Sequence, residues 1–191
     1  MQEISIDAQK RALRERQLAL RAAIPQDERG RLDAALVREI ARHPAFLAAD
    51  ALLLYAPVRG EPDLLPLFAL AAKRAIPCAF PRCEGKEMHF CAVRDLSELE
   101  PGRFGILTPP KAAPVLTPSS KTLCILPALA ASKDGHRLGY GGGFYDRYLS
   151  HFSPYTLLGI YQALLTDEIP TEPTDKPADA VITEKGVLYR A

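Results

Sequence analysis

The chain of 191 residues has the length of one domain, and its 48% hydrophobic and 25% charged residues are typical of a globular protein. That composition excludes a disordered tail, a coiled coil and a collagen-like fibre. Lysine and arginine number 24 against 23 acidic residues, so the net charge of +1 gives no general attraction to nucleic acid or to a membrane surface.

Residues 7–43 predict two helices separated at Pro25. Asp7 is expected as the first N-cap, and the helix after Pro25 has leucine and isoleucine spaced to face a core. The apolar side of the first helix is expected from Ala12, Leu13, Leu20 and Ile24. Lys10, Arg14 and Arg21 fall at i, i+4 and i+11, so three cations share one stripe of that helix.

Short apolar runs bounded by proline and glycine predict buried strands after these helices. They occupy residues 51–55, 76–80, 87–93, 123–126, 156–161, 180–183 and 187–189, with helices expected near 63–74 and 143–152. This alternation predicts a single α/β domain over residues 1–191, with a largely parallel sheet flanked by helices and the N-terminal helical pair packed on or beside it. Ligands of such sheets bind in the loops after the strands, here 56–62, 127–143 and 162–179.

Nothing at the N-terminus resembles the apolar segment of a secretory signal, and no run approaches the ~20 uncharged apolar residues of a spanning helix. The four cysteines form no C-x-x-C pair, which favours reduced thiols in a cytoplasmic protein. A zinc cluster of Cys83, His89 and Cys91 is the less favoured alternative, because structural zinc sites use tighter paired spacings. We expect a cytoplasmic monomer that binds neither nucleic acid nor membrane.

A glycine-rich stretch at 136–147 carries the densest chemical signal. Four glycines in positions 139–143 let the backbone approach a ligand closely, and a helix starting there adds its partial positive charge. Arg137 adds a formal charge suited to phosphate. The stretch is neither a Walker A loop, which needs Gly-Lys-Ser/Thr, nor the dinucleotide fingerprint, which would need glycine at 144. A polyphosphate cradle is favoured over a surface hairpin or a cluster of C-cap glycines.

Asp146 lies in the first turn of the helix that follows the glycines. A carboxylate there is suited to hold Mg²⁺ against bound phosphates, because magnesium prefers one or two carboxylates together with phosphate oxygens. The alternative is an acid that only complements the helix dipole, worth a few tenths of a kcal/mol. Position alone favours the second interpretation.

Residues 126–130 followed by 134–149 closely resemble the signature of the 5-formyltetrahydrofolate cyclo-ligase family. The basic segment 10–14 is similar to the family's opening helix, and 55–61 resembles its strand and loop ending in glutamate. Further segments occur in the family's order and extend the resemblance over nearly the whole chain: 81–82, 88–90, 102–106 and 178–181.

The resemblance implies ATP- and Mg²⁺-dependent conversion of 5-formyltetrahydrofolate to 5,10-methenyltetrahydrofolate, with release of ADP and phosphate. The formyl oxygen would be phosphorylated by ATP, after which the folate N10 attacks the activated carbon. This order is chemically reasonable, because a formamide oxygen is a poor leaving group and a phosphate is a good one. Phosphoryl transfer itself depends mostly on positioning and charge neutralisation.

The resemblance also implies a role for particular residues. Its ATP contacts fall on Lys10, Arg14, Arg137, Leu138, Gly139, Tyr140, Gly141, Gly142, Gly143, Phe144 and Tyr145. Its substrate contacts fall on Ala56 and Glu61 and on part of the glycine loop, namely Tyr140, Gly141, Gly142, Gly143 and Phe144. Its magnesium carboxylates fall on Asp146 and Asp179. We expect Glu61 to accept hydrogen bonds from the pterin N–H groups.

The chain departs from the family in places. The loop has only glycines where some relatives carry a lysine, and the runs 62–64 and 108–110 are unusual. Two alternatives therefore stay open. One is a related ATP-dependent enzyme acting on another small formylated or carboxylated substrate. The other is a nucleotide- or RNA-binding module that uses the basic stripe, which the near-zero net charge disfavours.

Overall fold

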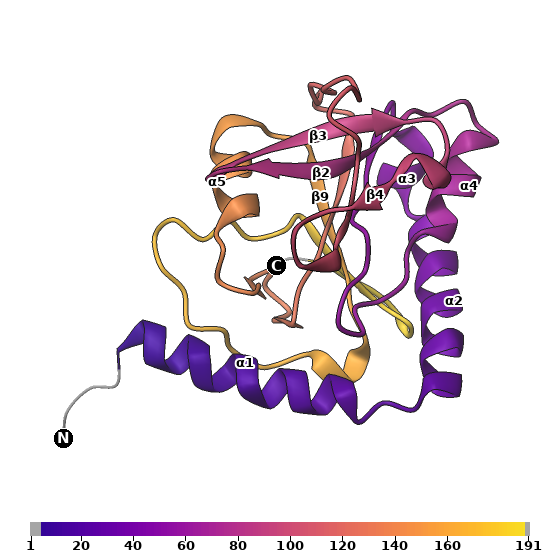
Figure 1. The fold of residues 1–191 in the computed structure, drawn as a ribbon. Helices are drawn as coiled ribbons and strands as arrows, with labels where there is room; N and C mark the ends of the chain where they lie inside the picture. The colour runs from indigo at the N-terminus through magenta and orange to yellow at the C-terminus, as the bar shows by residue number, and fades with distance from the viewer. Residues whose placement is uncertain (1–4, 190–191) are drawn as a thin grey trace.

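A seven-stranded sheet of order β11-β10-β9-β6-β1-β2-β3 forms the centre of the computed structural model, which describes residues 5–189 (Figure 1). Its strands are β1 (Leu52–Leu53), β2 (Cys78–Glu84), β3 (Glu87–Val93), β6 (Leu123–Leu126), β9 (Tyr155–Gly159), β10 (Ala180–Thr183) and β11 (Gly186–Tyr189). The five strands from β2 to β10 in this order pair in parallel, and the two edge strands pair antiparallel. The predicted α/β class with a largely parallel sheet is confirmed.

The central strands are apolar along their whole length because both faces of the sheet are covered. Every residue of β1 and β6 is buried, and Leu52 pairs with Leu123 on one side and with Cys78 on the other. A parallel sheet leaves no solvent face on which polar residues could alternate. The apolar runs recognised in the sequence are therefore its strands.

Helices enclose the sheet. They are α1 (Ile6–Ala22), α2 (Gln26–Arg42), α3 (Pro44–Ala48), α4 (Pro66–Ala72) and α5 (Phe144–His151), with 3₁₀ turns at Leu96–Glu98, Arg103–Gly105 and Gln162–Leu164. In Figure 1, α1 and α2 lie along two adjacent sides of the molecule. Helix α2 buries Leu36 and Ile40 and packs on β10 and α4, whereas α5 packs on β3. No helix in residues 5–189 is long and apolar enough to cross a membrane.

One expectation about α1 is wrong and another holds only in part. Ser5, not Asp7, is the N-cap, because its side chain accepts a hydrogen bond from Ala8 N. Of the expected apolar side, Ile24 packs on the main core and Leu13 on a small cluster, whereas Ala12 is exposed and Leu20 is 42% exposed. The buried side chains of α1 are instead Lys10, Gln17 and Arg21. The polar stripe of this helix is the side turned inward.

Other elements differ in length or were not predicted. β1 is shorter than 51–55, although Leu54 N still donates to Ala79 O, and α4 is shorter than 63–74. Helix α3 was missed because His43 and Pro44 end one helix and begin the next, with His43 Nδ1 accepting from Ala45 N at 3.2 Å. Two small hairpins were also missed: β4 (Glu100–Pro101) with β5 (Leu107–Thr108), and β7 (Ala130–Ala131) with β8 (Arg137–Leu138).

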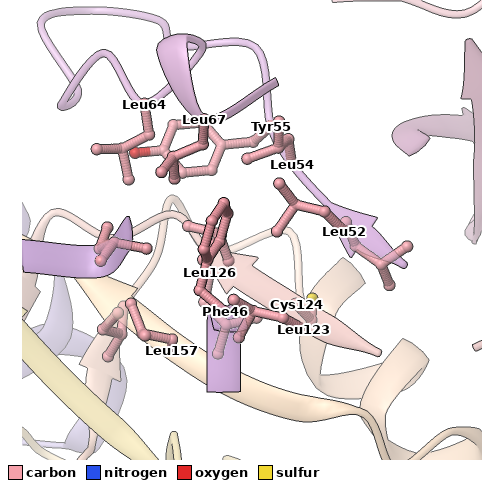
Figure 2. Close-up of a cluster of buried hydrophobic side chains, with 14 of the residues drawn as sticks. Phe46, Leu52, Leu54, Tyr55, Leu64, Leu67, Leu123, Cys124, Leu126 and Leu157 are labelled. Carbon is pink, nitrogen blue, oxygen red and sulfur yellow. The ribbon is translucent and has the colours of Figure 1, made fainter. Parts of the chain in front are cut away.

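The main core lies between the central strands and the helices that cover them. Figure 2 shows Leu64 and Leu67 over Leu54 and Tyr55, with Phe46 beside the side chains of β6. Gly159, at the end of β9, leaves room for this packing. A Cβ atom at Gly159 would lie 2.9 Å from Leu64 Cδ1 and 3.1 Å from Ile40 Cδ1.

Replacing Gly159 by alanine should therefore lower the free energy of unfolding by about 1–3 kcal/mol through overpacking. Gly30 provides a matched control, because it is exposed within α2 and a Cβ atom there meets nothing within 4 Å. Gly30→Ala should stabilise the protein by about 0.5–1 kcal/mol. Chemical denaturation of the two variants checks the opposite signs, and a neutral Gly159→Ala would contradict the tight packing.

Candidate active site

Loops that follow β1, β6 and β9 converge with α1, as expected for ligand-binding loops of a parallel sheet. Arg14 Nε donates to Gly139 O at 2.9 Å and so ties α1 to the loop after β6. Lys10 Nζ ties the same helix to the loop after β9, through Glu172 and Asp175. A Cβ atom at Gly60, in the loop after β1, would lie 3.6 Å from Arg21 Cδ. The three loops predicted from the sequence thus all reach α1.

The glycine loop ends at the start of α5. Gly141 and Gly143 have φ values of +91° and +64°, a conformation that side chains rarely adopt. Gly143 is the N-cap of α5 and provides no side-chain cap, so the first N–H groups of the helix remain available to an anion. Arg147 Nη2 holds the loop by donating to Gly142 O at 2.9 Å.

Arg137 and Asp146 form an ion pair beside this loop. Arg137 Nη2 donates to Asp146 Oδ1 at 2.7 Å, and the same oxygen accepts from Lys176 N at 3.1 Å. Arg137 also donates to Lys176 O. The structure therefore brings together the predicted phosphate-binding arginine and the predicted magnesium carboxylate, and it anchors both to the loop after β9.

Lys10 is nearly buried, and its ammonium lies 2.7 Å from both Glu172 Oε2 and Asp175 Oδ2. Burial lowers the pKa of Lys10, but the hydrogen bonds and charges of these two acids outweigh it and raise the pKa above its ordinary value. Sequence reasoning missed both acids. The loop 162–179 was identified by its place after a strand, but no local pattern indicates which of its acids reaches α1.

Glu61 lies in the loop after β1 and is 6% exposed. Its Oε2 accepts from Val58 N at 3.0 Å. Burial raises the pKa of Glu61 to about 7, and the Val58 N–H, Arg21, Tyr140 and Arg59 each lower it and so oppose the shift. A buried carboxyl group titrating near neutrality is typical of functional sites.

Tyr140 connects the glycine loop with Glu61. Its ring is 39% exposed and is flanked by two guanidinium groups, with Arg59 Cζ at 5.6 Å and Arg21 Cζ at 6.0 Å from the ring centroid. Ala56, the other predicted substrate contact of the loop after β1, is buried. Arg21 and Arg59 were not among the predicted site residues, although Arg21 lies on the stripe of α1 that the sequence revealed.

The other predicted contacts in and beside the loop have different surroundings. Phe144 lies 4.9 Å from Arg147 Cζ, measured from the ring centroid, and Tyr145 packs edge-on against Phe90. Leu138 is buried in a small cluster with Ala130. The side chain of Leu138 is thus part of a core, so that only its backbone could contact ATP.

Asp179 has different hydrogen-bonding partners from the Arg137–Asp146 pair. It immediately precedes β10, and its Oδ2 accepts from Thr156 N at 2.8 Å and Thr156 Oγ1 at 2.7 Å. Asp146 and Asp179 share no hydrogen-bonding partner among residues 5–189. No group of three or more His, Cys, Asp or Glu side chains in that range is arranged to hold a metal ion. Any magnesium site here would depend on one or two carboxylates and on oxygens of a bound ligand.

A parallel α/β fold, a glycine loop opening a helix and a buried carboxyl group with a raised pKa are together typical of enzymes that act on small molecules. The model of the 5-formyltetrahydrofolate cyclo-ligase family matches residues 6–184. The chain therefore belongs to this enzyme family, as the sequence motifs predicted.

Individual relatives agree with this assignment. The chain is 24% identical over 198 residues to the 5-formyltetrahydrofolate cyclo-ligase of Mus musculus, covering 96% of this chain and 98% of the relative. It is 30% identical over 175 residues to that of Escherichia coli K12, covering 87% and 96%. The structure of Aquifex aeolicus 5,10-methenyltetrahydrofolate synthetase superposes with a TM-score of 0.84 at 30% identity, covering 95% of this chain and 92% of that one.

The raised pKa of Glu61 predicts how the free energy of unfolding depends on pH. Between its ordinary value of 4.5 and about 7, the folded state holds a proton that the unfolded state has lost. Ionised Glu61 therefore destabilises the fold, and stability should fall as the pH rises through this window. Glu61→Gln should match the wild type near pH 4.5 and exceed it by up to about 3 kcal/mol at pH 8. Unfolding curves from pH 4.5 to 8 test this, and a constant difference between the two proteins would contradict it.

Proposed function

We propose that this chain catalyses the ATP- and Mg²⁺-dependent cyclisation of 5-formyltetrahydrofolate to 5,10-methenyltetrahydrofolate, with release of ADP and phosphate. Family membership over residues 6–184 carries the proposal. The uncapped start of α5 behind the glycine loop supports the ATP requirement, because this is an anion-binding arrangement. All residues assigned below come from one chain, which is consistent with a monomer.

The reaction proceeds in two steps. The formyl oxygen attacks the γ-phosphorus of ATP, and ADP leaves. The folate N10 then attacks the activated formyl carbon, its proton is lost, and the C–O bond breaks to release phosphate as the ring closes. Binding both substrates in one cleft makes each attack effectively intramolecular, which is the main contribution a protein can make to such a transfer.

The ATP phosphates bind at the backbone of Gly139–Gly143 and the first turn of α5. Arg137 stands beside this position, and Arg14 reaches it through its bond to Gly139 O. Lys10 supplies a further cation on the same helix face. Since this loop has no lysine of its own, these three side chains provide the positive charge that neutralises the transferring phosphoryl group.

The donor set beside the glycine loop fits a magnesium ion bound together with phosphates. Both hydrogen bonds to the Asp146 carboxylate are accepted by Oδ1. Oδ2 is therefore the oxygen that we assign to the cation, and Asp179 is the second proposed carboxylate. A bound Mg²⁺ would neutralise phosphate charge during the transfer.

The reduced folate binds between the loop after β1 and the glycine loop. We assign Ala56 and Glu61 to the pterin, with Tyr140 and the neighbouring backbone of 141–144 lining the shared part of the site. The RNA-binding alternative loses its support, because Lys10 is only 7% and Arg21 0% exposed. The stripe of α1 faces the enzyme's own loops instead of an external polyanion.

The direct test is to mix the purified protein with 5-formyltetrahydrofolate, ATP and Mg²⁺ and to follow the absorbance that methenyltetrahydrofolate has and its precursor lacks. Appearance of product that requires all three components is expected. ATP binding without any absorbance change would favour a related enzyme with another formylated or carboxylated substrate.

Asp146→Asn should lower kcat severely and raise the Mg²⁺ concentration needed for half-maximal rate, because asparagine lacks the charge that binds a hard cation. Its stability cost should be only about 1 kcal/mol, from the lost charge-assisted bond to Arg137. Asp27→Asn is a matched control, since Asp27 is also a first-turn acid but lies in α2 and is exposed. Near-normal turnover of Asp146→Asn at low magnesium would remove Asp146 from the metal site.

Gly142→Pro should abolish ATP binding while leaving most of the fold intact. Proline removes the N–H at this position and fixes φ near −65°, and both changes are unsuited to a loop that surrounds phosphate. Calorimetric titration with ATP beside a thermal melt measures the two effects separately. Unchanged affinity in a folded variant would exclude the loop as the phosphate site.

A further inference from the structure

Arg21 is a buried, charged residue of α1 that has no role in the mechanism proposed above. It lies in the last turn of α1 and is 0% exposed. Its Nη2 donates to Ala128 O over a long 3.4 Å, whereas Nε and Nη1 have no hydrogen-bonding partner among the described residues. A buried guanidinium with two unpartnered nitrogen atoms costs stability, which indicates a partner that arrives from outside the chain.

The surroundings of Arg21 place these donors at the predicted folate site. Its Cζ lies 6.0 Å from the centroid of the Tyr140 ring, and its Cδ would lie 3.6 Å from a Cβ atom at Gly60, the residue before Glu61. Its charge acts on the carboxyl group of Glu61. A side chain with only donors thus stands next to one that, when ionised, has only acceptors.

No other polar group discussed near Glu61 is at once buried, charged and in possession of unpartnered N–H groups. Arg59 is exposed, and the Tyr55 hydroxyl already donates to Pro62 O at 2.9 Å. The Tyr145 hydroxyl is buried and unpartnered within residues 5–189, but it is uncharged. Arg21 is the side chain here that offers a buried formal charge together with free N–H groups.

The pyrimidine edge of a reduced pterin presents an acceptor beside two donors: the 4-oxo group, N3–H and the 2-amino group. A carboxylate accepts from the two donors, and a guanidinium next to it donates to the oxo group. We propose that Arg21 is a specificity-determining residue that donates to the pterin 4-oxo group while Glu61 accepts from the adjacent N–H groups. This inference rests on the proposed function and extends it to a residue of α1.

Two ligands separate this role from simple packing: 5-formyltetrahydrofolate and its 2,4-diamino analogue, in which an amine replaces the 4-oxo group and N3 carries no hydrogen. An amine cannot accept from a guanidinium as the oxo group does. The wild type should prefer the 4-oxo ligand by about 10- to 100-fold, the range expected for a charge-assisted hydrogen bond. Equilibrium dissociation constants for both ligands measure the preference without requiring turnover.

Arg21→Met keeps the length of the side chain and removes its donors and charge. It should remain folded, because replacing an unsatisfied buried charge by an apolar side chain is neutral or stabilising. The preference should fall by about 10-fold or more, mainly through weaker binding of the 4-oxo ligand, while the part that arises from the N3–H contact of Glu61 remains. Arg21→Lys, which retains a charged donor, should preserve part of the preference for the 4-oxo ligand. Arg16→Gln, on the exposed side of α1, should leave the preference unchanged.

The outcomes distinguish this inference from the function on which it rests. A wild type that converts 5-formyltetrahydrofolate, with an Arg21→Met variant that retains the full preference, would overturn the assignment of Arg21 and leave the function standing. A wild type that neither binds nor converts the folate would overturn both. Loss of preference in Arg21→Met with partial retention in Arg21→Lys supports the assignment. Should Arg21→Met fail to fold, an Arg21→Lys variant with the full wild-type preference for the 4-oxo ligand over the 2,4-diamino ligand would overturn it.

Discussion

The contact between the polar side of α1 and the loops at the carboxyl ends of the strands is the interaction on which the candidate site depends. Lys10 binds the loop after β9, Arg14 binds the loop after β6, and Arg21 reaches the region of Glu61. A helix normally docks through apolar side chains, but here the inward side carries three cations. Helix α1 thus contributes much of the positive charge of the candidate site, beside Arg137.

Burial gives these charges their chemical effect. Exposed ion pairs contribute little to stability, whereas charges withdrawn from water act strongly on each other and on a ligand. Glu61 and Arg21 are both nearly inaccessible, and Nε and Nη1 of Arg21 have no hydrogen-bonding partner within the described residues. The fold thus maintains an unfavourable arrangement that a ligand with complementary donors and acceptors would satisfy, which is how preorganised sites gain specificity.

Local sequence patterns predicted the sheet better than they predicted the site. Runs such as 123–126 are apolar throughout, and this signal does not depend on the rest of the chain. The glycine loop was singled out because four glycines within five positions are unusual, and Asp146 because it lies in the first turn of the helix that follows them. Glu172 and Asp175 were missed because their partner, Lys10, lies 162 and 165 residues away. The apolar side of α1 was predicted only in part, because hydrophobic periodicity gives no sign that Arg21 would be buried and Leu20 exposed.

The same long separation between Lys10 and its acidic partners bears on how the protein is made. Helix α1 is synthesised before the loop after β9, because Lys10 precedes Glu172 and Asp175 by 162 and 165 residues. Until that loop emerges from the ribosome, Lys10 lacks the two acidic partners that it has in the folded chain, although folding proceeds from the N-terminal end. A nascent chain that has not yet exposed this loop therefore has an incomplete form of the candidate site.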